Sequence, residues 1–139
     1  MNRAEIERLI AAGAAEAARL HGRIHETFRS RDDGPRQREA WVSACAEFHS
    51  RYDALAFPGG YEGAVERLLA GDAYTVEATV CFLEAKPYFH RSGYMFSRLL
   101  RKAGRAPLSA AQAARLQAVV EREARWREER LQRLAAGMR

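Results

Sequence analysis

Apolar residues recur at steps of three and four along most of the chain, the spacing of one face of an α-helix. The first stripe predicts a helix from about residue 2 to residue 30, with Ile6, Ile10, Gly13, Ala17, Leu20, Ile24 and Phe28 as its buried face. Gly34 and Pro35 then mark a turn, because Gly and Pro together interrupt a helix. The second stripe predicts a helix that ends at Pro58, with Trp41, Cys45, Phe48, Tyr52 and Leu55 on its buried face.

Three shorter helices are predicted between Tyr61 and Gly104. Gly71 with Asp72 divides the first from the second, since Asp caps a new helix, and Pro87 cannot continue the second. The middle helix, residues 73–85, is apolar on nearly every side and is therefore expected at the centre of the fold. The third is predicted over residues 92–103.

The last predicted helix is long and runs to about Ala136. Ser109 and Gln112 have the spacing of a capping box at its start. Its expected buried stripe is Leu116, Val120, Ala124, Leu131 and Leu134, and its expected surface ion pairs are Glu121 with Arg125, Glu123 with Arg127 and Glu129 with Arg133. At about 1.5 Å per residue, the first and last helices each reach about 40 Å. We therefore expect a compact, single-domain all-α bundle of about five or six helices over residues 1–139, with the two long helices packed side by side around the shorter ones.

Composition agrees with an all-helical fold. Val, Ile and Thr number 12 among the 139 residues, against 27 Ala. No run approaches the roughly 18 apolar residues of a membrane span, so we expect a cytoplasmic protein, with Cys45 and Cys81 as reduced thiols in helical segments. The 21 Arg against 2 Lys indicate GC-rich, bacterial-like coding before they indicate any ligand.

Charge placement is the most informative feature for function. No acidic residue occurs between Glu84 and Glu121, and seven basic residues fall in this interval, while the rest of the chain carries 16 basic against 18 acidic residues. Periodicity turns the side chains of Arg91, Tyr94, Arg98, Arg101, Lys102 and Arg105 outward, so we expect them to form the contact face for an acidic protein partner. Trp126, beside the stripe of the last helix, either covers the first helix or anchors a partner, and this helix is where we would expect a homodimer.

Two alternatives use other chemistry. The same basic face also suits sequence-independent binding of nucleic acid phosphates, whereas residues 73–85 offer too few polar side chains for a recognition helix. In addition, His21 and His25, like Cys45 and His49, stand four residues apart on helices expected to adjoin, a spacing that would allow a tetrahedral zinc site.

The sequence offers no catalytic constellation. Glu77 and Glu84 share one face of the most apolar helix, where burial would raise the pKa of a carboxyl and suit it to acid–base work, or where the pair would form ion pairs with Arg91 or Arg98. There is no phosphate loop, nucleophile elbow or metallohydrolase motif, and no motif specific enough to name a family. We therefore expect a non-enzymatic interaction domain without a cofactor, either a regulatory adaptor or a small inhibitory, antidote-like protein.

Overall fold

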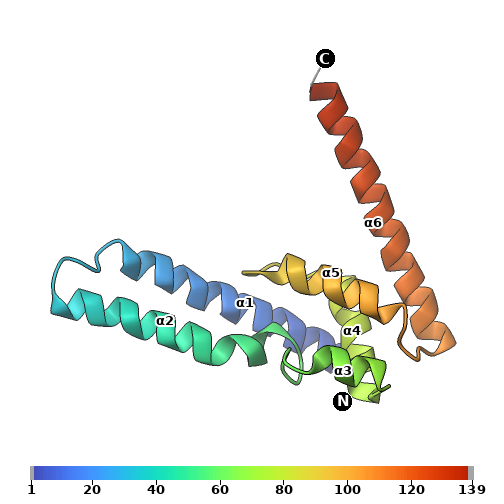
Figure 1. The fold of residues 1–139 in the computed structure, drawn as a ribbon, viewed down its shortest axis with the longest axis horizontal. Coiled ribbons are helices and arrows are strands. Elements are labelled where there is room, and N and C mark those ends of the chain that lie inside the picture. The colour runs from blue at the N-terminus through green and yellow to red at the C-terminus, as the bar shows by residue number, and fades with distance from the viewer. Residues whose placement is uncertain (1, 138–139) are drawn as a thin grey trace.

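The computed structural model describes residues 2–137, which form six helices joined by short loops (Figure 1). The helices are α1 (Arg3–Phe28), α2 (Pro35–Ala56), α3 (Ala64–Leu69), α4 (Ala73–Ala85), α5 (Ser92–Ala103) and α6 (Ala110–Gly137). The all-α class and the number of helices are confirmed. The predicted caps are also present: the Asp72 carboxylate accepts from the Thr75 amide, and Ser109 and Gln112 form a reciprocal capping box.

Helices α1 and α2 form an antiparallel hairpin that extends beyond the rest of the molecule (Figure 1). Gly13 allows the two helices to approach closely, because a Cβ atom at this position would collide with the carbonyl oxygen of Leu55. The predicted stripe of α1 is buried from Ile6 to Leu20, but Phe28 at its far end is exposed. The tip of the hairpin therefore lies outside the main core.

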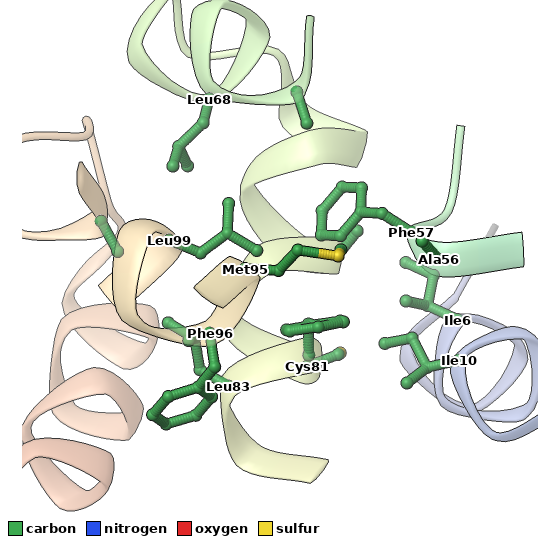
Figure 2. Close-up of a cluster of buried hydrophobic side chains, with 14 of the residues drawn as sticks. Ile6, Ile10, Ala56, Phe57, Leu68, Cys81, Leu83, Met95, Phe96 and Leu99 are labelled. Carbon is green, nitrogen blue, oxygen red and sulfur yellow. The ribbon is translucent and has the colours of Figure 1, made fainter. Parts of the chain in front are cut away.

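Helix α4 is the centre of the core, as its nearly continuous apolar sequence predicts. All residues from Thr75 to Leu83 except Glu77 are buried. Figure 2 shows Cys81 and Leu83 of α4 in the cluster to which α5 contributes Met95 and Leu99. Because α1, α3, α5 and α6 all pack on α4, this helix fixes where the outer face of α5 lies.

Helix α6 does not lie along α1, so the expected side-by-side packing of the two long helices is wrong. Its first half packs against α4, and its second half runs away from the other helices (Figure 1). The reason is polar anchoring: Arg115 bridges Glu77 and Glu84, and Arg122 donates to the last carbonyls of α4. These contacts hold the first half of α6 along α4, and the helix continues past the end of α4.

The predicted buried stripe of α6 is also corrected. Leu116 is buried, whereas Ala124 is exposed and Leu131 and Leu134 are 67% and 56% exposed. Val120 is exposed too, and Val119 takes its place in the core. The three expected ion pairs within the helix do not form among residues 2–137, because Glu123 pairs with Lys86 and Arg122 and the other members point into solvent. None of the helices formed by residues 2–137 combines the length and the apolar run needed to cross a bilayer.

Candidate functional site

The outer face of α5 is where the structure places the predicted basic side chains. Met95, Phe96, Leu99 and Ala103 point inward and anchor the helix to the core. The opposite face carries the predicted contact residues: Arg91, Tyr94, Arg98, Arg101 and Arg105 are exposed, and Lys102 is half-buried. We call these six residues the α5 face. Tyr94, with 79% of its surface exposed, stands among the cations.

The cations of the α5 face have no carboxylate partners within residues 2–137. Of the seven basic residues in the acid-free interval, only Lys86 and Arg115 form ion pairs. Glu77 and Glu84 pair with Arg115, and not with Arg91 or Arg98. The remaining five positive charges therefore stay unneutralised on one side of the molecule, where their fields add.

The loop that precedes α5 is held in a defined shape. Lys86 and Arg91, at its two ends, are the non-glycine residues of the described chain with positive φ, at 47° and 69°. Such backbone conformations are costly for residues with a Cβ and persist only when the surroundings enforce them. Here the Tyr52 hydroxyl donates to the His90 carbonyl over 2.6 Å, and Ser92 Oγ accepts from the Phe89 amide. Arg91 is thereby fixed at the start of the α5 face.

Two hollows flank the α5 face. A cleft of about 1010 Å³ is bounded by α1, the loop before α5, α5 itself and α6. A smaller pocket of about 370 Å³ lies between α5, α2 and the loop after α2. Arg91 and Tyr94 line both hollows and form the ridge between them.

Trp126 lines the larger cleft and does not cover α1. It is 44% exposed, and the Lys86 ammonium lies 4.7 Å from its ring centroid, within the range of a cation–π contact. Lys86 also forms an ion pair with Glu123, which neutralises its charge. Trp126 is therefore accessible to a partner in the cleft, whose wall it shares with Arg91 and Tyr94 of the α5 face.

The four residues proposed for zinc do not assemble. No group of three or more potential metal ligands occurs in the part of the chain that the structure describes. His21 stacks on His90 with ring centroids 4.3 Å apart and touches His25 edge-on, while His49 packs on Phe48. Both Cys45 and Cys81 are free thiols. The pKa of His21 is lowered by burial and by the neighbouring His90 and His25, so its ring serves as a packing element beneath the loop before α5.

Glu77 and Glu84 are structural carboxylates. Burial acts to raise the pKa of Glu77, but hydrogen bonds from Gln112 and Arg115 outweigh it and hold that pKa below its usual value. This is the opposite of the shift expected for a general acid. Burial and the adjacent Glu77 raise the pKa of Cys81 to about 11, so the thiol stays protonated.

Sequence reasoning missed Tyr52 and Tyr61, which line the smaller pocket with Arg91 and Arg98. They lie on α2 and in the loop that follows it, about 40 and 30 residues before α5. Tyr52 belongs to the apolar stripe of α2, and nothing in its spacing distinguishes a pocket wall from a core residue.

Comparison with known protein families, curated proteins and solved structures found no match for this chain.

Proposed function

We propose that the protein is a small, non-enzymatic interaction domain that binds an acidic partner protein through the α5 face. The observation that supports this is the set of exposed cations without ion pairs, which stand beside an exposed tyrosine. Arg and Tyr are enriched at protein interfaces because they bury large areas and donate directed hydrogen bonds. A regulatory adaptor and an inhibitory, antidote-like protein both suit such a face.

The partner is proposed to be a protein because the unpaired charge is local. Outside the acid-free interval the chain is slightly acidic, so the cationic footprint covers one helix face and its flanks. Non-specific binding to nucleic acid depends on many phosphate contacts at once. A single face with an aromatic centre fits a compact acidic patch better than an extended polyanion.

A charge-reversal pair tests the proposal. R98E/R101E lowers the charge of the α5 face from +5 to +1, and R8E/R36E makes the same change of net charge on exposed, unpaired arginines of α1 and α2. We expect wild type and R8E/R36E to capture the same acidic proteins from a nuclease-treated lysate of the source cells, and R98E/R101E to lose them. Equal capture by all three would show that the contact face is wrong. Retention of wild type on duplex or single-stranded DNA at physiological salt, lost in R98E/R101E, would favour nucleic acid as the ligand.

We further propose that a second copy of the chain covers the exposed apolar residues of α6, Val120, Leu131 and Leu134. From residue 120 onward, five Arg and four Glu nearly balance within the described helix, so two such helices do not repel each other strongly. The α5 face, in contrast, would place like charges against each other in a symmetric dimer. The two surfaces are thus suited to different partners.

A further inference from the structure

The smaller pocket beside α5 combines two kinds of side chain. Its wall consists of Tyr52, Tyr61, Arg91, Tyr94, Met95 and Arg98. Its volume of about 370 Å³ is within the range of sites that hold small ligands or single side chains. We propose that this pocket binds an aromatic ring that carries an anionic group.

The anionic part follows from Arg91 and Arg98. Arg98 lies on α5, and Arg91 lies immediately before its first residue, where the loop holds it; both side chains line the same pocket. Neither forms an ion pair within residues 2–137, and none of the six wall residues is acidic. Two free guanidinium groups at one pocket bind a carboxylate or phosphate group through paired hydrogen bonds.

The aromatic part follows from the three tyrosines and Met95. The Tyr52 ring is fixed by its hydroxyl bond to the His90 carbonyl and by Phe48, whose centroid lies 5.2 Å away. Burial raises the pKa of Tyr52, with the charge of Arg91 acting in the opposite direction, so the phenol remains neutral at physiological pH. Met95 extends from α5 into the core toward Phe57 (Figure 2), and its flank forms the inner wall of the pocket.

These walls suit a flat, polarisable group. Tyrosine rings stack against another ring, and a methionine thioether makes favourable contacts with an aromatic edge. A bare anion would use the two arginines alone, and a bare ring would leave both charges unmatched. A ligand that joins the two parts contacts every wall residue, which is why the combination is proposed.

The inference deepens the proposed function, and it rests on that function where the bound group belongs to the acidic partner. An acidic partner that presents an aromatic side chain beside a carboxylate would fill the pocket while its other acids meet Arg101 and Arg105. The same chemistry is present in a free aromatic acid. The probes for the test are therefore phenyl phosphate, as the free form, and the peptide acetyl-Glu-Phe-Glu-amide, as the partner-like form.

Titration calorimetry with matched probes tests the ligand class. We expect phenyl phosphate to bind about tenfold more tightly than inorganic phosphate or phenol, which each offer one half of the chemistry. We also expect phenyl phosphate to shift the labelled methyl resonance of Met95 through its ring current, and inorganic phosphate to leave that resonance unmoved. If phenyl phosphate binds no better than inorganic phosphate, the pocket is only a charge site and the inference is wrong. Tighter binding of phenyl phosphate identifies a free small molecule as the ligand, and tighter binding of the peptide identifies a side chain of a partner protein.

Variants of exposed residues locate the binding. R98Q removes one guanidinium group and is expected to weaken phenyl phosphate about tenfold, the effect of losing a charged hydrogen bond. Y94A should weaken it as well, and Y94F should retain it. R105Q is the matched control, just beyond the C-terminal end of α5 and outside the pocket, and should bind as wild type does. Equal losses in R98Q and R105Q would overturn the assignment.

The two proposals fail separately. R101E/R105E lowers the charge of the α5 face from +5 to +1 and leaves all six wall residues unchanged. If the acidic-partner proposal alone is wrong, phenyl phosphate still binds and protein capture does not depend on α5. If the pocket proposal alone is wrong, R101E/R105E loses captured proteins while no variant shows specific binding of phenyl phosphate.

Discussion

Two regions of the acid-free interval meet opposite surroundings. The cations of the α5 face project into solvent without ion pairs, whereas Arg115, at the start of α6, is 18% exposed and bridges two carboxylates of α4. Their sequence context is alike, since both belong to the same run of basic residues without a neighbouring acid. They differ in the direction that their side chains face: the cations of α5 point away from α4, whereas Arg115 of α6 points toward it. Partner geometry, not local charge density, decides which arginines hold the fold and which remain available for binding.

Replacing Arg115 should give the largest effect on stability. R115A leaves the partly buried Glu77 without a cation and Glu84 with only the more distant Arg3, and we expect it to lower the free energy of unfolding by about 2 kcal/mol, less than the loss for a fully buried pair. R105A, on the exposed α5 face, should change it by less than about 0.5 kcal/mol. Urea unfolding of both variants measures the difference. Similar losses in the two would mean that the contrast between the regions is false.

Acid should weaken the Arg115 network before it affects the α5 face. The folded-state pKa of Glu77 lies below its unfolded value, so its contribution is fully present above that unfolded value, about 4.5, and is lost as pH falls through the folded pKa. Unfolding free energies measured from pH 6 down to about pH 3 should therefore fall more steeply for wild type than for E77Q, whose amide does not titrate. Parallel curves for the two proteins would remove Glu77 as the cause.

Arg122 and Arg125 form a second matched pair on α6. Arg122 donates to the carbonyls of Leu83 and Glu84, both over 2.8 Å, at the end of α4 where helical carbonyls lack partners. R122A should lower the unfolding free energy by about 1 kcal/mol and speed amide exchange near the end of α4. R125A should have no measurable effect, because Arg125 is exposed and unpaired. Equal exchange in the two variants would contradict the capping role.

The sequence predicted the elements better than their arrangement. The sequence predicts α4 at the centre because apolar residues occur on nearly every side of residues 73–85, and such a helix is stable only when neighbours surround it. The outward α5 face followed from the inward stripe of Met95 and Leu99. The direction of α6 could not be predicted, because Val120, Leu131 and Leu134 have the spacing of a buried stripe although no apolar surface covers them within the described chain.

The candidate site was likewise predicted only in part. The cations of the α5 face were found from the absence of nearby acids in the sequence. The smaller pocket needs Tyr52 and Tyr61 from a distant segment, and the Tyr52 hydroxyl also contacts the loop before α5. Contacts between segments so far apart leave no periodic signal in a single sequence.

The smallest effect on folding should come from shortening α6. Residues 128–137 are all exposed, so a chain that ends at Arg127 should unfold in dilute solution within about 0.5 kcal/mol of wild type. It lacks Leu131 and Leu134, however, and should therefore be monomeric in sedimentation runs at concentrations where the full chain forms a dimer. The variant L131E/L134E, which keeps the helix length, should reproduce the loss of the dimer. A full chain that is monomeric throughout would reject the dimer and leave the α5 face untouched, because the two surfaces lie on different helices and differ in charge.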